Sequence, residues 1–294
     1  MRNAFIDELA KLAQQQPQIA LVVGDLGFSV IEPFADRFPE RFINAGVAEQ
    51  NMTGLAAGMA SEGYHVFTYS IANVPTFRCA EQIRNDVDYQ KLAVTVVAVG
   101  GGLAYGALGY SHHAVQDYAL MRSMPNMLIA APGDPSEVRA CLRYLVEHPQ
   151  PSYLRLGKTG EKDYHHTVPA LVPGEWHPVA PLGRDARHVL LSTGATLELA
   201  MALQQRPDFR EHSVCSMPLW GLASKPQQPA QVAGHESVTT LEDHLEDGGF
   251  GSWLMESLKH TPELRSRVHS RSLDAEVCGR VGSQATLNAQ GGLR

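Results

Sequence analysis

The sequence predicts an α/β protein built from parallel sheets with helices on their faces. Short apolar segments alternate with helical segments along the first half of the chain, and the same alternation returns after residue 187. Segments that are apolar at nearly every position are typical of parallel strands buried on both faces. The alternation therefore predicts two doubly wound α/β domains, in which ligands bind beyond the carboxyl ends of the strands.

Three apolar segments are the predicted strands of the first domain. They span residues 19–23, 93–99 and 127–131. A helix over residues 4–15 is predicted to precede the first strand. A second helix is predicted after the third strand, with apolar residues at helical spacing: Val138, Cys141, Leu142 and Leu145.

A polar, proline-bearing segment separates the two predicted domains. Residues 161–181 show little hydrophobic periodicity, which is typical of a linker or an irregular crossing segment. We therefore place the first domain at residues 1–160 and a smaller second domain at residues 182–294.

The second domain repeats the α/β pattern. Its predicted strands are residues 188–192, 213–216 and 238–241, and a glycine cluster precedes a helix that begins at about Ser252. The last twenty residues contain few large apolar side chains, so they are expected to be peripheral.

Composition excludes several classes of function. The formal net charge is −7, and the lysines and arginines are dispersed, so we expect no nucleic-acid partner. No apolar segment reaches the roughly 18 residues that a bilayer requires, and no signal sequence is evident, so a cytoplasmic protein without a membrane partner is expected. The four cysteines lack Cys-x-x-Cys spacing and the thirteen histidines lack zinc-site spacing, which predicts reduced thiols and no metal ligands.

The most informative segment, residues 41–59, places one carboxylate in a small and apolar stretch. This residue, Glu49, lies close to Gly46, Gly54 and Gly58. The glycines disfavour an ordinary amphipathic helix and favour close packing against a backbone or a flat ligand. A carboxylate in that setting is suited to exchange a proton with a ligand nitrogen, while a solvated residue at a helix start explains it equally well.

Several blocks of sequence resemble the pyrimidine-binding module of transketolase-like thiamine diphosphate enzymes. The first block, Arg-Phe-Ile-Asn-Ala-Gly-Val-Ala-Glu-Gln-Asn-Met, is similar to the family's strand that leads into Gly-[Ile/Val]-Ala-Glu-[Gln/His]. The blocks follow the family's order over roughly residues 1–160, and a weaker match to the family's C-terminal domain extends to about residue 260. The further blocks are Tyr69-Ser70, Arg78 to Asp86, Ser111-His112-His113-Ala114, Met124 to Met127 and Tyr153 to Lys158.

The resemblance implies cofactor contacts for four residues. The family's glutamate hydrogen-bonds the aminopyrimidine and promotes its imino tautomer, which implies that Glu49 is catalytic and binds the cofactor. Phe77 and Tyr69 are the implied aromatic wall of the pyrimidine, although core packing explains these rings equally well and the family's usual phenylalanine position holds Val74. Asp25 resembles a polar residue near the thiazolium, or a structural turn residue.

The resemblance also implies substrate contacts. His112 stands at the family's channel histidine, which implies a catalytic and substrate-binding role, and His113 replaces the usual glutamine beside it. Lys158, with Arg155 nearby, stands where the family grips a substrate phosphate or carboxylate, although solvated surface charges are a close alternative. The acidic residue that the family commonly carries before this histidine motif is absent, which predicts a donor or acceptor other than the usual sugar phosphates.

Half of the family's active site is absent from the sequence. The family binds the diphosphate through a metal held by a Gly-Asp-Gly motif, and the chain has no Gly-Asp-Gly. The resemblance therefore implies thiamine diphosphate and Mg²⁺ as cofactors, with the metal bound mainly by a separate N-terminal subunit that carries this motif. An α2β2 heterotetramer is the expected assembly.

The expected function is that of the C-terminal subunit of a split transketolase. Such an enzyme transfers a two-carbon ketol unit from a ketose or ketose phosphate to an aldehyde. Two alternatives remain open, namely the β subunit of a 2-oxo-acid dehydrogenase-type decarboxylase and a non-catalytic scaffold subunit of the same fold.

Overall fold

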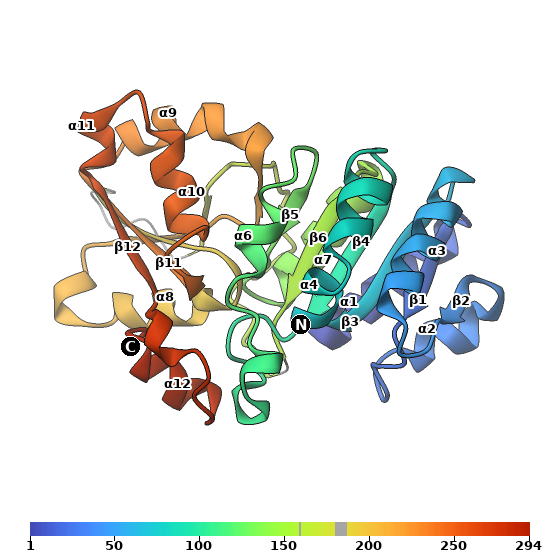
Figure 1. The fold of residues 1–294 in the computed structure, drawn as a ribbon. Helices are drawn as coiled ribbons and strands as arrows, with labels where there is room; N and C mark the ends of the chain where they lie inside the picture. The colour runs from blue at the N-terminus through green and yellow to red at the C-terminus, as the bar shows by residue number, and fades with distance from the viewer. Residues whose placement is uncertain (159, 180–186) are drawn as a thin grey trace.

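Two sheets with flanking helices form the protein and lie side by side (Figure 1). The computed structural model describes residues 1–158, 160–179 and 187–294. The α/β fold class is therefore confirmed, and the two sheets agree with two domains.

The first sheet has the strand order β10-β5-β6-β4-β3-β1-β2 among the described residues. All of its neighbouring strands are parallel except β10, which pairs antiparallel with β5. Its strands are β1 (Ile19–Val23), β2 (Phe42–Asn44), β3 (His65–Ile71), β4 (Val94–Val99), β5 (Leu128–Ala130), β6 (Ser152–Leu156) and β10 (Leu219–Trp220).

Short and long helices connect these strands. The α-helices are α1 (Arg2–Gln15), α2 (Glu32–Arg37), α3 (Glu49–Ser61), α4 (Asn73–Phe77), α5 (Ala80–Gln82), α6 (Asp117–Met121) and α7 (Pro135–Glu147). The single-turn helices η1 (Pro39–Arg41), η3 (Gly106–Leu108) and η4 (Tyr110–His112) are 3₁₀, and η2 (Ile83–Asp88) is a π-helix.

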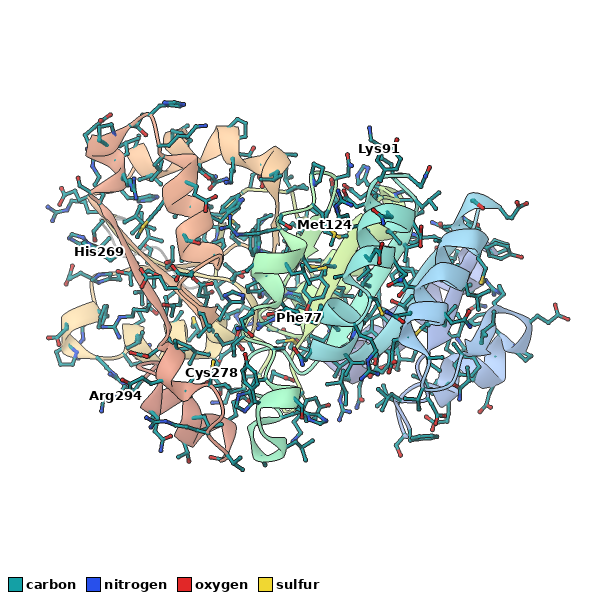
Figure 2. The ribbon with its side chains drawn as sticks, viewed as in Figure 1. Phe77, Lys91, Met124, His269, Cys278 and Arg294 are labelled. Atoms are coloured by element: carbon teal, nitrogen blue, oxygen red, sulfur yellow. The ribbon has the colours of Figure 1, made fainter. Side chains whose placement is uncertain are left out.

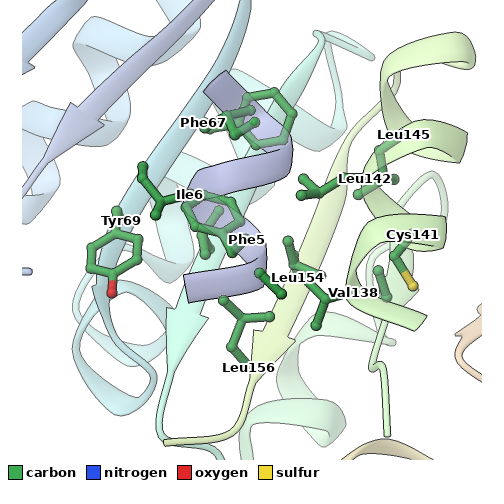
Figure 3. Close-up of a cluster of buried hydrophobic side chains, with 14 of the residues drawn as sticks. Phe5, Ile6, Phe67, Tyr69, Val138, Cys141, Leu142, Leu145, Leu154 and Leu156 are labelled. Carbon is green, nitrogen blue, oxygen red and sulfur yellow. The ribbon is translucent and has the colours of Figure 1, made fainter. Parts of the chain in front are cut away.

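The two faces of the first sheet bury different layers because side chains alternate along each strand. Val97 and Val99 of β4 face the core formed with α1 and α7, in which Phe5 is fully buried (Figure 3). Val96 and Ala98 face the opposite side, where the core is shared with the second sheet. This shared layer is a hydrophobic interface between the two halves of the chain.

The second sheet has the order β12-β11-β8-β9-β7 and is parallel except for β7. Its strands are β7 (His177–Pro178), β8 (His188–Ser192), β9 (Ser213–Ser216), β11 (Ser237–Leu245) and β12 (Val268–Leu273). Its helices are α8 (Leu197–Gln204), α9 (Gln228–Ala233), α10 (Phe250–Ser257), α11 (Pro262–Arg265) and α12 (Gln284–Gln290), with 3₁₀ turns η5 (Gly194–Thr196), η6 (Pro207–Phe209), η7 (Leu222–Gln227) and η8 (Ala275–Val277).

The predicted strands 19–23, 188–192 and 213–216 match β1, β8 and β9 in their bounds. Two short strands lie where no strand was predicted. β7 belongs to the segment predicted as a linker, and β10, which comes from the second half of the chain, joins the first sheet. The division at residues 160 and 182 stays a prediction.

The expectation that the last twenty residues are peripheral is wrong. Leu287 and Leu293 are buried, and they pack in one cluster with Leu103 and Val115 from the first half of the chain. Figure 1 accordingly shows α12 beside the segment that follows β4. A few well-placed leucines suffice to dock a segment whose overall composition is polar.

Two further expectations concern cysteines and membranes. All four cysteines are free thiols, and Cys79, Cys141 and Cys215 are buried. Among the described residues, no helix combines the length and the apolar character that a membrane span requires.

Candidate functional site at the carboxyl ends of the first sheet

Glu49 is the first residue of α3 and is buried, with 3% of its surface exposed. A carboxylate in the first turn of a helix interacts favourably with the helix dipole. The preceding Ala48 has no side-chain cap, so the carboxylate is directed away from capping and is free to pair elsewhere.

The Glu49 carboxylate accepts a hydrogen bond from Arg78 at 2.7 Å (Nη1 to Oε2). The Arg78 side chain is 53% exposed, so this partner reaches in from solvent. Gly24, at the end of β1, packs against Glu49 and Ser70 so closely that an added Cβ would lie 3.5 and 3.6 Å from their side chains. The buried Ser70 hydroxyl has no hydrogen-bond partner among the described residues.

Asp25 lies at the same edge of the sheet and is exposed. Its carboxylate accepts a hydrogen bond from Asn44 Nδ2 at 2.9 Å, and its backbone adopts a positive φ of 55°. The sheet therefore brings Asp25 and Glu49 to neighbouring strand ends, as parallel strands β1 and β2 require.

Tyr69 lies away from this edge, in the core. Its ring is 2% exposed and packs 5.7 Å from the ring of Phe5 in α1 (Figure 3). Burial raises the pKa of the Tyr69 hydroxyl to about 12. The cofactor contact predicted for Tyr69 stays untested, and this geometry favours the alternative of core packing.

Phe77 and His113 line one pocket of about 300 Å³ beside α4. The Phe77 ring is 46% exposed, and Figure 2 labels it on the first half of the molecule. His113 is 1% exposed, and neither of its ring nitrogens has a hydrogen-bond partner among the described residues. Burial lowers the pKa of His113, which favours the neutral imidazole. The other lining residues are Asn73, Tyr110, Ser111 and Gln116.

His112 and His113 belong to a segment that we call the histidine loop, residues 103–113. Gly102 and Ala114 close the base of the loop through two backbone hydrogen bonds of 2.9 Å. His112 is half-buried, and its Nδ1 lies 3.0 Å from the Ser111 hydroxyl. Asn73 Nδ2 donates to the Ser111 carbonyl at 2.8 Å, which fastens the loop to α4.

Lys158 is exposed and lies on the opposite flank of the histidine loop. Its Nζ is 5.3 Å from the ring centroid of Tyr105, a loop residue. Lys158 also lines a pocket of about 590 Å³ between the two halves of the chain, together with Glu161 and Asp243. It is therefore accessible to an anion, as a grip on a substrate requires.

Arg155 is buried, with 2% of its surface exposed. Its guanidinium donates to Asp117, Tyr118, the Ala114 carbonyl and Asp243. A substrate contact by Arg155 stays an untested prediction, and a guanidinium with all its donors engaged inside the protein speaks against it.

The structure thus groups the predicted site residues in three places. Glu49 and Asp25 share the edge of β1 and α3, Phe77 and the two histidines surround the next pocket, and Lys158 lies beyond the loop. Sequence reasoning missed the roles of Ser70, Asn73 and Arg78. Ser70 and Arg78 stand in blocks that carried the family resemblance, but only the fold shows which atoms they face.

The fold and this edge define a two-domain α/β protein with a binding site at the carboxyl ends of parallel strands. A family model described as "Transketolase, pyrimidine binding domain" matches residues 1–160. The chain belongs to the transketolase family.

Similar proteins of known sequence are transketolase subunits and sections. One of the two subunit types of an apulose-4-phosphate transketolase, from Phocaeicola vulgatus, is 32% identical over 269 residues, which cover 89% of this chain and 84% of that protein. A putative transketolase C-terminal section of Methanocaldococcus jannaschii is 33% identical over 259 residues, covering 87% and 81%. A 1-deoxy-D-xylulose-5-phosphate synthase of Paenarthrobacter aurescens is 31% identical over 264 residues, but the match covers only 40% of its length.

Solved structures agree. A split gene transketolase, described as an inactive beta4 tetramer, superposes with a TM-score of 0.83 at 28% identity and covers 99% of this chain and 93% of that chain. The transketolase of Leishmania mexicana has a TM-score of 0.80 at 19% identity and shares the fold, with 43% of its length covered.

Proposed function

We propose that this chain is one subunit of a two-chain, thiamine diphosphate-dependent transketolase. The enzyme moves a two-carbon ketol unit from a ketose or ketose phosphate to an aldehyde acceptor. The observation that carries the proposal is the buried carboxylate of Glu49 at the start of α3, at the sheet edge where ligands of such folds bind. Similarity to subunits of split transketolases supports it.

The residues at this edge fit an aminopyrimidine. Glu49 offers a carboxylate to a ring nitrogen, the orphaned Ser70 hydroxyl offers a further polar contact, and Phe77 exposes an aromatic face. The partner of Glu49 in this structure is Arg78, whose half-exposed side chain can move into solvent when a ligand arrives. A planar, nitrogen-bearing ring suits this set.

When bound, thiamine diphosphate supplies the electron sink that bond cleavage beside a carbonyl requires. The role of Glu49 is to hold a proton at the pyrimidine nitrogen and to control its tautomer. His112 and His113 bind the hydroxyl and carbonyl oxygens of the sugar, and a neutral imidazole offers one donor and one acceptor for this task. Lys158 binds an anionic group of the substrate as a point charge.

The partner in this proposal is an N-terminal subunit that carries a Gly-Asp-Gly motif. It supplies the diphosphate site and holds Mg²⁺, and two copies of each chain form an α2β2 heterotetramer. The absence of Gly-Asp-Gly from the sequence supports this division, as does the 43% coverage of a single-chain transketolase. The dehydrogenase-type decarboxylase and the scaffold are less well supported, because the relatives named above include transketolase subunits and the Glu49 carboxylate is kept.

Reconstitution tests the proposal. The chain is assayed alone and with the candidate N-terminal subunit, in the presence of thiamine diphosphate, Mg²⁺ and a panel of ketose donors and aldehydes. We expect ketol transfer only in the mixture. A complex that binds the cofactor but transfers nothing from any ketose would overturn the proposed reaction, and decarboxylation of a 2-oxo acid in the same mixture would replace it with the alternative.

A further inference from the structure

The Arg155 side chain joins the two halves of the protein at a buried point. Its Nε donates to Asp117 Oδ2 at 2.7 Å, and its Nη2 donates to the Ala114 carbonyl at 2.8 Å. Both acceptors belong to the first half of the chain. Its Nη1 donates to Asp243 Oδ1, and Asp243 belongs to β11 of the second sheet. One guanidinium therefore contacts elements of both halves at once.

Asp117 and Asp243 flank this cation as buried carboxylates, with 0% and 2% of their surfaces exposed. Tyr153 also donates to Asp117 Oδ2, at 2.6 Å. A buried ion cluster contributes geometry more than net stability, because desolvation offsets much of the Coulomb attraction. A fixed geometry at this point therefore calls for a role in positioning.

The element that this cluster positions is the base of the histidine loop. Ala114, which accepts from Arg155, pairs with Gly102 across that base. Gly101 and Gly102 pack so closely here that a Cβ on Gly101 would lie 2.5 Å from Arg155 Cζ, and a Cβ on Gly102 would overlap Asp243. Both ends of the loop therefore rest on the Arg155–Asp243 pair.

We propose that Arg155 is a positioning residue through which the second domain holds the histidine loop. Asp243 fixes the guanidinium, and the guanidinium fixes Ala114 and Gly101, so that His112 and His113 meet the substrate from a defined place. The effect on activity rests on the proposed function, whereas the effect on the loop does not. Leu287 and Leu293 support the loop from the same domain through apolar contacts.

Hydrogen exchange of the full-length chain tests the coupling. The variant Asp243→Asn removes the charge that fixes Arg155 and keeps the size of the side chain. We expect the amides of residues 103–114 to exchange about tenfold faster than in the wild type, because a hydrogen bond between charged groups is replaced by a weaker one. A second variant, Gly101→Ala, displaces the guanidinium sterically without removing a charge and should loosen the same segment.

The matched control is Glu256→Gln. Glu256 pairs with Arg122, and this ion pair also joins the two halves of the chain but does not contact the histidine loop. We expect no change of exchange in residues 103–114 for this variant. Wild-type exchange of the loop in both Asp243→Asn and Gly101→Ala, or equal loosening by Glu256→Gln, would overturn the proposal. If one of the two variants does not fold, the other decides.

Kinetics in the reconstituted mixture separate positioning from a merely structural role. The loop carries the substrate-binding histidines, whereas Glu49 lies on α3, so Asp243→Asn should raise the KM of the ketose donor about tenfold and leave the half-saturating concentration of thiamine diphosphate unchanged. Equal losses for donor and cofactor would contradict the assignment. If no mixture shows activity, the proposed function fails, and the exchange experiment still decides on the coupling.

Discussion

At the scale of single residues, Glu49 combines burial with a replaceable partner. Its carboxylate is 3% exposed and is balanced by Arg78, which reaches it from a half-exposed position. An ion pair with one exposed member contributes little to stability. The arrangement therefore keeps a carboxylate ready for a ligand without making the fold depend on it.

The substitution Glu49→Gln should abolish turnover and leave the fold intact. We expect kcat of the reconstituted enzyme to fall by about a hundredfold or more, since an amide cannot hold the proton. The free energy of unfolding should change by about 1 kcal/mol or less. Steady-state assays and thermal unfolding measure the two effects. Glu62→Gln, at the exposed far end of the same helix, is the control that should keep full activity.

His113 is the second residue whose surroundings point to a ligand. A buried imidazole with two unpaired nitrogens carries a desolvation cost that a substrate hydroxyl can remove. We expect His113→Leu to leave the Tm unchanged or higher, because it removes unpaired polar atoms, and to raise the donor KM about tenfold. A lower Tm with an unchanged KM would show instead that the ring is only a packing element.

At the scale of elements, the start of α7 gathers charged groups from three segments. Asp134 caps the helix by accepting from the Glu137 amide at 2.7 Å, and it also accepts from the Tyr164 amide and from His165 Nδ1. Burial alone would raise the pKa of Asp134, but the hydrogen bonds from His165 and the backbone outweigh it and lower the pKa. Asp134 therefore fastens the crossing segment after residue 160 to α7.

Removing this cap should destabilise the chain. Asp134→Ala leaves two amides and a histidine without their acceptor, so we expect a loss of about 2–4 kcal/mol in the free energy of unfolding. Denaturant titration of the full chain measures it. Asp163→Ala is the comparison, because Asp163 is exposed and accepts only from Ser136 in this cluster. A loss of similar size in both variants would refute the capping role.

At the scale of the whole molecule, buried titratable groups give stability opposing pH dependences. Burial lowers the pKa of His65 to about 4 and raises those of Glu137 and Glu242 to about 7 and 8. Below pH 6.5 the unfolded chain protonates His65 and the folded chain does not, so this residue destabilises the fold as the pH falls from 6.5 to 4. The two carboxyls act in the opposite direction between pH 8 and 4.5.

A difference between variants isolates the histidine. We expect the change in unfolding free energy between about pH 7.5 and about pH 5 to shift in favour of the lower pH by about 2 kcal/mol in His65→Leu. The Thr95 hydroxyl that contacts His65 keeps a hydrogen bond to Ser152 in that variant. Urea titrations at both pH values measure the shift, and exposed His260→Gln should show the wild-type dependence.

Much of the fold was predictable because its signals are local. Strands β1, β8 and β9 are almost wholly buried, and α7 has apolar residues at helical spacing, so each could be predicted from a short stretch of sequence. The edge strands β7 and β10 each span two residues and carry no such pattern. Their pairing depends on which strand ends are left open, and that is decided by the assembled sheets.

The sequence by itself determined the α/β class, the family and the isolated carboxylate of Glu49, because periodicity and motif spacing are properties of neighbouring residues. Only the tertiary structure decided that Tyr69 packs in the core, that His113 faces a pocket, and that Arg155 is enclosed by Asp117 and Asp243. The Arg155–Asp243 pair joins residues 88 positions apart. The environment of a side chain depends on such distant contacts, and residue type alone does not specify them.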